Sequence, residues 1–379
     1  MTSFTFATAG RIVFGVGTVS QLPALVAEFG GRPFVCTGSN PRRHGAVLDA
    51  LPDAAVFPVP HEPTMETVRE AAAAARVHGA QVVVGLGGGA ALDAAKVVAA
   101  LVTNGGDPLD YAEVVGDGRP LLERSLPVVA VPTTSGTGSE VTANGVVTSS
   151  EHRVKVSLRS ASMLPAVALV DPELTLAVPA AVTAHAGLDA LVQCIEPFVS
   201  PFATPIVDGF CREGIRRAAR SLRRVYADGS DLAARTDMSL CSLLSGLALA
   251  NGKLGAAHGL AGPLGGLLGA PHGAITAAVM VPVSRANLTE LAGQEDAGPA
   301  LGRYAEVGEL LTGVRDAEAL LAWFAETAAL LGVRGLSTLG MTEADVPGIA
   351  LAASRASSTR GNPVRLPVAR FEEIVRAAL

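Results

Sequence analysis

Two histidines, His258 and His272, stand fourteen residues apart in a stretch that is otherwise rich in glycine and apolar residues. A buried imidazole needs a hydrogen-bond partner or a metal ion, and histidine is the commonest metal-binding side chain. Asp189 lies in another apolar stretch, where a carboxylate is costly to bury unless it is paired or bound to metal. One carboxylate with two imidazoles suits Zn²⁺ or non-haem Fe²⁺. The alternative is a pair of structural histidines and an exposed or capping Asp189.

A glycine-rich segment, Val82 to Lys96, has the pattern of a buried strand, a tight turn at Gly87, Gly88 and Gly89, and a helix. Such a turn lets the backbone approach a ligand, and the helix start presents free amides to phosphate. Residues 85, 87 and 90 also satisfy a loose GxGxxA pattern. The turn follows the fourth expected strand, whereas the usual dinucleotide fingerprint follows the first. The alternative is a turn that uses glycine for steric reasons alone.

A second segment, residues 132–142, carries many hydroxyl groups around two glycines directly after an expected strand. The spacing of Thr137 and Glu140 predicts a capping box for a following helix. A well-capped loop is the simpler interpretation, but together with the glycine turn the segment favours a nucleotide pocket. The hydroxyl-bearing residues are Thr133, Thr134, Ser135, Thr137 and Ser139.

A third loop follows the second expected strand and begins with Gly38, Ser39 and Asn40, which we expect to contact the cofactor. An acidic residue here would accept hydrogen bonds from a ribose 2′-hydroxyl, but the loop has none. Small residues followed by Arg42 and Arg43 better suit a 2′-phosphate, which favours NADP over NAD. The alternative is that the two arginines form a solvated surface pair.

The order of apolar segments predicts an N-terminal α/β dinucleotide-binding domain with a parallel sheet over residues 1–178, and an all-α metal and substrate domain over residues 179–379. Helical spacing is clearest at Thr64–His78, Leu232–Ala250 and Ala317–Leu331. Six short strands are expected at Arg11–Phe14, Pro33–Cys36, Ala55–Val59, Gln81–Val84, Pro127–Val131 and Ala166–Val170.

Charge and composition indicate which kinds of partner and which cellular location to expect. The 379 residues include 29 basic and 35 acidic side chains without a continuous basic stripe, so neither nucleic acid nor an anionic membrane is expected. The four cysteines are scattered and lack CxxC spacing, which indicates reduced thiols. No apolar stretch has membrane-spanning length and the N-terminus lacks a signal-peptide pattern, so a cytoplasmic location is expected.

The chain resembles the iron-containing (group III) alcohol dehydrogenase family over nearly its full length. The matching stretches are GGGAALDAAK at 87–96, PTTSGTGSEVT at 132–142, LVDPELT at 169–175, GLDALVQ at 187–193, and HGLAGPLGG followed by PHG between 258 and 273. The resemblance implies hydride transfer between NAD(P)(H) and an alcohol or aldehyde, and at least a dimer. It implies metal ligands at Asp189, Gln193, His258 and His272, a cofactor-domain signature at Asp93 and Lys96, and cofactor contacts from Gly88, Gly89, Thr133, Thr134 and Ser139.

Three positions depart from the family pattern. Ala90 replaces the usual serine after the triple glycine, and Gly262 replaces a histidine that many members carry. The fourth metal ligand, normally histidine, is Gln193, whose neutral oxygen is a poorer ligand for a first-row transition metal. His185, one turn before Asp189, is either a substitute ligand or a structural residue.

The sequence therefore predicts an NAD(P)-dependent oxidoreductase that transfers hydride between nicotinamide and a small alcohol, aldehyde or ketone. Fe²⁺ or Zn²⁺ held by the catalytic residues Asp189, His258 and His272 would assist. One alternative is a metal-independent enzyme resembling maleylacetate reductase. Another is a nucleotide-binding protein without activity. The expected partner is a small-molecule substrate, and the expected assembly is a homodimer.

Overall fold

The computed structural model describes residues 3–113, 115–152 and 154–379. It divides into two compact units, one of Ala7–Ala177 and one of Val178–Leu379 together with the segment that ends at Phe6. The division falls next to the boundary placed after residue 178, while the start of the chain groups with the second unit.

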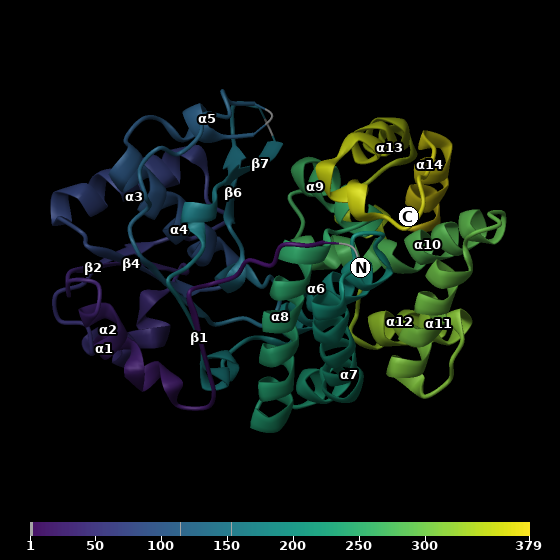
Figure 1. The fold of residues 1–379 in the computed structure, drawn as a ribbon, viewed down its shortest axis with the longest axis horizontal. Coiled ribbons are helices and arrows are strands. Elements are labelled where there is room, and N and C mark those ends of the chain that lie inside the picture. The colour runs from purple at the N-terminus through teal and green to yellow at the C-terminus, as the bar shows by residue number, and fades with distance from the viewer. Residues whose placement is uncertain (1–2, 114, 153) are drawn as a thin grey trace. The chain divides into compact units, whose positions relative to one another are not determined.

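The first unit is built on a six-stranded sheet in which every paired neighbour is parallel. This arrangement confirms the α/β class, and Figure 1 labels β1, β2 and β4 of the sheet. Each strand coincides with an expected one to within a few residues. β4 lies inside the sheet, so the turn at its carboxyl end is flanked by strands on both sides. In spatial order the strands are β1 (Arg11–Phe14), β8 (Val167–Val170), β5 (Val128–Pro132), β4 (Val82–Gly87), β2 (Pro33–Thr37) and β3 (Ala55–Pro58).

Helices cover both faces of the sheet, which explains why its inner strands are almost continuously apolar. Along β2, Phe34 and Cys36 pack with α3 (Met65–His78) and α4 (Gly89–Asn104), whereas Val35 packs with α1 (Leu22–Ala27). α3 begins after Thr64, whose hydroxyl accepts a hydrogen bond from the Thr67 amide at 3.1 Å. The shorter helices of this unit are α2 (Gly45–Asp49) and α5 (Pro108–Tyr111).

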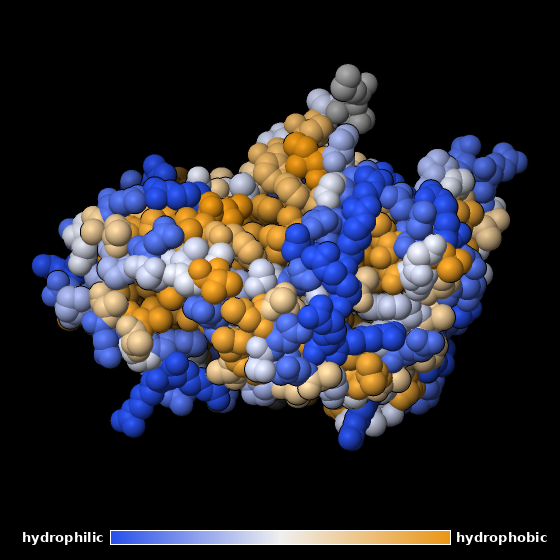
Figure 2. Space-filling model, turned by 90° about the horizontal axis from the view of Figure 1, so that it is seen from below, coloured by the Kyte–Doolittle hydropathy of each residue, from blue (hydrophilic) through white to orange (hydrophobic). Residues whose placement is uncertain are grey.

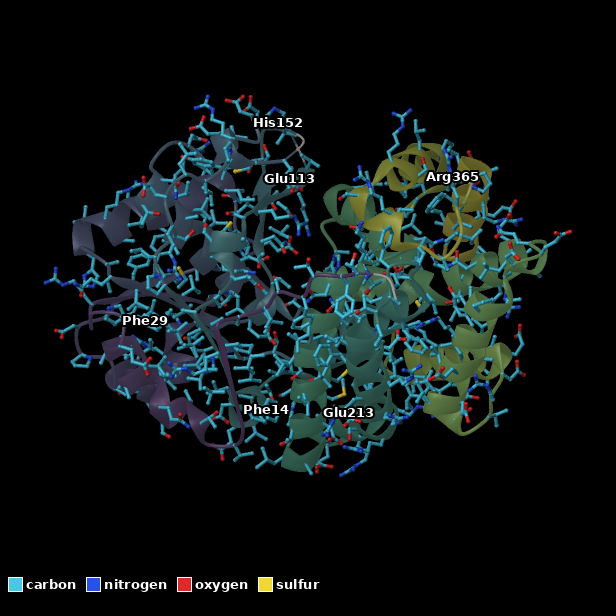
Figure 3. The ribbon with its side chains drawn as sticks, in the orientation of Figure 1. Phe14, Phe29, Glu113, His152, Glu213 and Arg365 are labelled. Atoms are coloured by element: carbon cyan, nitrogen blue, oxygen red, sulfur yellow. The ribbon has the colours of Figure 1, made fainter. Side chains whose placement is uncertain are left out.

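An antiparallel pair of strands, β6 (Asn144–Ser149) and β7 (Val154–Arg159), was not predicted. Along β6, buried residues alternate with partly exposed ones, so it lacks the continuous apolar run by which the other strands were found. The Ser149 hydroxyl lies 2.9 Å from Nδ1 of His152, and Arg159 pairs with Glu113 at 3.3 Å. His152 and Glu113 are labelled in Figure 3.

The second unit is helical, and no described residue after Val170 lies in a strand, which confirms the all-α prediction. α8 and α12 begin at the predicted residues. Close helix packing depends on small residues, because a Cβ at Gly187 would lie 2.4 Å from Leu222. The helices are α6 (Ala180–Val199), α7 (Pro205–Ala227), α8 (Leu232–Gly252), α9 (Ala256–Leu268), α10 (His272–Ala292), α11 (Gly298–Thr312), α12 (Ala317–Leu330), α13 (Val346–Arg355) and α14 (Val368–Ala377).

Among the described residues, no single helix combines the length and apolar character needed to cross a membrane. Within the described part of the chain, only α8 and α9 taken together have the length and apolar composition of a membrane span. The two helices are bent by 101° where they join. On the face drawn in Figure 2, hydrophobic residues occur in several patches with hydrophilic residues between them. All four cysteines are free, as their scattered spacing predicted, and all four are buried.

Gly85 allows β4 and α4 to pack closely, and this yields a first prediction. A Cβ at Gly85 would lie 3.0 Å from the Leu92 side chain and 3.1 Å from the Cβ of Ala95. We expect Gly85→Val to lower the free energy of unfolding by about 1–3 kcal/mol through overpacking, as measured by urea denaturation. Gly45→Ala is the control, because nothing lies within 4 Å of its Cβ position. Equal stability of both variants would contradict this packing argument.

Candidate active site

Asp189 is a buried carboxylate on α6 that is hydrogen-bonded through both oxygens. Oδ1 accepts a hydrogen bond from Oγ1 of Thr276 on α10 at 2.8 Å, and Oδ2 accepts one from Nε2 of Gln193 at 2.8 Å. These two donors offset the cost of burying the charge. They also fix the orientation of the carboxylate.

His258 comes to the same place from α9 and is also buried. Its Nδ1 lies 2.6 Å from Oε2 of Glu196, and its Nε2 lies 3.6 Å from Oδ1 of Asp189. That separation is too long for a hydrogen bond, and Nε2 has no hydrogen-bond partner among the described residues. An imidazole nitrogen is therefore buried beside a carboxylate without a partner of its own.

His272 is the first residue of α10 and completes the group. Its Nε2 lies 4.0 Å from Oδ1 of Asp189, and its ring centroid lies 5.4 Å from that of His258. A Cβ at Gly273 would lie 2.2 Å from the carbonyl oxygen of His185, so only glycine lets α10 start this close to α6. With 40% of its side chain exposed, His272 is the accessible side of the group.

The three side chains form a candidate metal site. One ligand atom from each of Asp189, His258 and His272 lies within 4.8 Å of the others. Zn²⁺ binds imidazole nitrogen and carboxylate oxygen at about 2 Å, so ligand atoms around one ion stand roughly 3–4 Å apart. The partnerless Nε2 of His258 is the atom that such an ion would satisfy.

Gln193 presents its amide nitrogen, not its oxygen, to Asp189. Its Oε1 accepts a hydrogen bond from the Ser245 hydroxyl at 2.9 Å. In this arrangement the amide holds the carboxylate in place, and metal ligation by Gln193 stays a prediction. His185 is half-buried, and burial lowers its pKa.

Charge compensation shapes the pKa values of the site. Burial by itself would raise the pKa of Asp189, but the imidazoles of His272 and His258 and the Thr276 hydroxyl hold it below its ordinary value. Burial opposes a charge on His258, yet Glu196 and Asp189 together raise its pKa to about 10.

Glu196, Thr276 and Ser245 were not identified from the sequence. These residues are not predicted ligands themselves, but each contacts one. Glu196 had a detectable signal. It lies three residues after Gln193 and seven after Asp189, which places all three on one face of α6. Thr276 and Ser245 had no comparable signal, because only the packing of α6, α8 and α10 brings them to the site.

In the first unit, the three predicted cofactor loops meet at the carboxyl ends of β2, β4 and β5. A Cβ at Gly87 would lie 3.2 Å from the Gly38 amide, and one at Gly88 would lie 3.2 Å from the Thr134 hydroxyl. A Cβ at Gly89 would lie 2.8 Å from the Thr137 methyl. Gly88 at the N-cap of α4 has no side chain to accept from the first amides of the helix. These amides suit a phosphate group.

The remaining predicted cofactor residues have different surroundings. Thr133 continues the ladder beyond β5, since its amide donates to the Gly87 carbonyl at 2.8 Å. Oδ1 of Asn40 accepts from the amide of Arg42 at 3.2 Å and orders the loop that also holds Ser39. Arg42 and Arg43 are both exposed.

Asp93 and Lys96 fasten the hydroxyl-rich loop to α4. Asp93 accepts hydrogen bonds from the Ser139 hydroxyl at 2.5 Å and the Val146 amide at 3.1 Å. The fully buried Lys96 ammonium lies 3.2 Å from Asp93 and donates to the Ser139 carbonyl at 2.9 Å. Burial lowers the pKa of Lys96, which the charge of Asp93 partly offsets. A cofactor contact by these residues stays a prediction.

The capping box predicted at Thr137 and Glu140 is wrong. Gly138 adopts a left-handed conformation with φ of 62° and begins only a three-residue 3₁₀ helix, Ser139–Val141. This turn points the Glu140 side chain into the protein interior, where 1% of the residue is exposed. Burial, only partly offset by its own backbone amide and by Lys96, raises the pKa of Glu140 to about 7.

Comparison with known proteins matches both units of the chain to one family. Residues 9–172 match the family model for iron-containing alcohol dehydrogenase, and residues 183–379 match the model for the C-terminal part of that family. The 1,3-propanediol dehydrogenase of Klebsiella pneumoniae is 37% identical over 79% of this chain and 76% of its own. The NAD-dependent methanol dehydrogenase of Bacillus methanolicus is 30% identical over the whole of both chains. A crystal structure of 1,3-propanediol oxidoreductase superposes with a TM-score of 0.91 at 33% identity, covering both chains fully.

The chain therefore belongs to the iron-containing alcohol dehydrogenase family, as its sequence motifs implied. It is an oxidoreductase that acts on alcohols or aldehydes.

The raised pKa of Glu140 makes stability depend on pH in a stated direction. Between about pH 4.5 and 7 the folded state keeps a proton that the unfolded state has lost, so the free energy of unfolding falls as pH rises. Between pH 4.5 and 8 we expect the free energy of unfolding of wild type to fall by roughly 2–4 kcal/mol relative to that of Glu140→Gln. Urea denaturation measures this difference. Glu123→Gln is the exposed control. A pH-independent difference between wild type and Glu140→Gln would contradict the assignment.

Gln193 yields a second prediction for this site. Gln193→Leu removes the donor to Oδ2 of Asp189 and leaves a buried carboxylate oxygen without a partner. We expect the free energy of unfolding to fall by about 1–3 kcal/mol in urea denaturation. Gln294→Leu, at an exposed position, should change it by less than about 0.5 kcal/mol. If both substitutions had the same small effect, Gln193 would not be holding Asp189.

Proposed function

We propose that this protein is a metal-assisted, NAD(P)-dependent dehydrogenase or reductase of small alcohols, aldehydes or ketones. The observation that carries the proposal is the convergence of Asp189, His258 and His272, with Nε2 of His258 buried and partnerless. Family membership and the NAD dependence in the name of the Bacillus methanolicus relative support it.

The proposed roles divide between the two units. When bound, the nicotinamide cofactor exchanges a hydride with the substrate carbon, and the metal ion acts as a Lewis acid toward the substrate oxygen. Asp189, His258 and His272 would hold the metal, and the exposed edge of His272 leaves room for substrate. Gly88 and Gly89, at the uncapped start of α4, would hold the cofactor pyrophosphate.

The cofactor type rests on the loop after β2. Gly38, Ser39 and Asn40 provide no carboxylate for a ribose 2′-hydroxyl, and Arg42 and Arg43 are exposed beside them. We therefore propose that NADPH binds more tightly than NADH. Replacing both arginines by serine should raise the KM for NADPH and leave that for NADH unchanged. A homodimer also stays a prediction, which analytical ultracentrifugation would test.

A metal-independent reductase is the second candidate, and Gln193 favours it, because its amide nitrogen faces Asp189 where the family normally places a histidine ligand. The two candidates differ in what chelation does. A metal-independent enzyme would keep full turnover with no metal detectable by elemental analysis.

The decisive experiment combines metal analysis with turnover. Protein reconstituted anaerobically with Fe²⁺ or Zn²⁺ should oxidise NAD(P)H with members of a panel of small aldehydes and ketones. His272→Ala and exhaustive chelation should each lower kcat/KM at least about 100-fold, because a Lewis acid supplies several kcal/mol of transition-state stabilisation. Undiminished turnover after chelation would overturn metal assistance. Cofactor binding without oxidation across the panel would indicate a nucleotide-binding protein without activity.

A further inference from the structure

Helix α9, which carries His258, begins without a cap of its own. Its first amides need acceptors, but Gly255 at the N-cap position has no side chain. Two residues from distant segments supply them. Oδ1 of Asn362 accepts from the Ala256 amide at 3.2 Å, and Oε1 of Glu196 accepts from the Ala257 amide at 2.7 Å. A Cβ at Gly255 would lie 2.8 Å from Oε1 of Glu196, so glycine makes room for the carboxylate.

The same carboxylate also binds the imidazole of His258. While Oε1 of Glu196 caps α9, Oε2 lies 2.6 Å from Nδ1 of His258. A helix N-terminus favours a negatively charged acceptor such as a carboxylate. An ionised carboxylate can only accept hydrogen bonds. Nδ1 of His258 must therefore carry a proton, and Nε2 is the nitrogen left to bind a metal.

We propose that Glu196 is a positioning residue, which fixes both the ring orientation and the protonated nitrogen of His258 so that Nε2 faces Asp189 and His272. The inference rests on the proposed metal site. Its basis is one buried carboxylate that holds a helix backbone with one oxygen and a side chain of that helix with the other. Because His258 is the third residue of α9, any shift of the capped helix end would also move the imidazole.

The surroundings of Glu196 allow an isosteric test. A cavity of about 10 Å³, room for roughly one water molecule, lies against its side chain. Its polar lining is neutral apart from Glu196. Asn287 exchanges hydrogen bonds with Asn362 at 2.7 and 3.1 Å, and donates to the Tyr304 hydroxyl at 2.9 Å. The hydroxyl of Ser284 is buried there and has no hydrogen-bond partner among the residues that the structure describes. Glutamine has the shape of glutamate and can still accept from the Ala257 amide, so His258 is the partner whose interaction with residue 196 changes most.

Glu196→Gln should reverse the hydrogen bond to His258. The Ala257 amide needs an acceptor, so the amide oxygen of the new side chain takes the place of Oε1 and its NH₂ group faces Nδ1. Nδ1 must then accept, which moves the imidazole proton to Nε2 and opposes metal binding there. We expect Co²⁺ affinity to fall about 10–100-fold, as measured by titrating its visible absorption, while circular dichroism stays unchanged.

Two variants separate positioning from stability. Asp237→Asn alters another buried carboxylate of this unit, which accepts from Ser221 at 2.6 Å and pairs with Arg220 at 2.6 Å. It should lower Tm without changing Co²⁺ affinity. Asn362→Ala removes the second cap of α9 without touching His258, so it should also lower Tm and change Co²⁺ affinity far less than Glu196→Gln does.

A measurement on the unmutated protein keeps the inference testable if Glu196→Gln does not fold. In Zn²⁺-loaded wild type labelled with ¹⁵N-histidine, the His258 resonances should show a protonated Nδ1 and a metal-bound Nε2. His258→Asn identifies these resonances. An unprotonated Nδ1, or wild-type Co²⁺ affinity in Glu196→Gln, would overturn the role of Glu196. Wild type that binds neither Co²⁺ nor Zn²⁺ would instead overturn the proposed metal site on which that role rests.

Discussion

Burial of the Asp189 carboxylate is the constraint on which the helical unit depends. A charge in an apolar helix core must be compensated, and no single helix supplies all the partners. Gln193 comes from α6 itself, Thr276 from α10 and His258 from α9. The packing of these helices is therefore tied to the chemistry of one side chain, and the same contacts that stabilise its charge bring two imidazoles beside it.

Both candidate sites also require backbone segments to pack closely against their neighbours, and glycine allows this at each site. Gly273 lets the start of α10 reach the backbone of α6, and Gly255 leaves space for Glu196 at the start of α9. In the first unit Gly88 and Gly89 lie against the threonine side chains of the neighbouring loop. A Cβ at Gly273 would collide with backbone, and at the other three positions it would crowd a neighbouring side chain.

Some charged residues of the family motifs face the candidate sites, whereas others hold neighbouring groups in place. Asp93 and Lys96 belong to the signature that follows the glycine turn, yet their hydrogen bonds run to Ser139, Thr142 and Val146. They hold the loop of residues 132–142 in position against α4. Glu196 has a comparable relation to His258, because its carboxylate fixes a side chain that faces the site. Such supporting residues set the geometry in which the exposed groups act.

The sequence by itself determined the class of fold and the strands of the parallel sheet, because periodicity is a local property of the chain. Residue chemistry and the family motifs also predicted Asp189, His258 and His272 as a group, which the structure brings together. It did not reveal β6 and β7, whose alternating pattern lacks a continuous apolar run, and it predicted a capping box where Gly138 turns the chain. Only the tertiary structure decided that Gln193 donates to Asp189 and that Glu196 holds His258. Hydrogen bonds between side chains depend on which helices pack together, and that packing joins residues from distant parts of the chain.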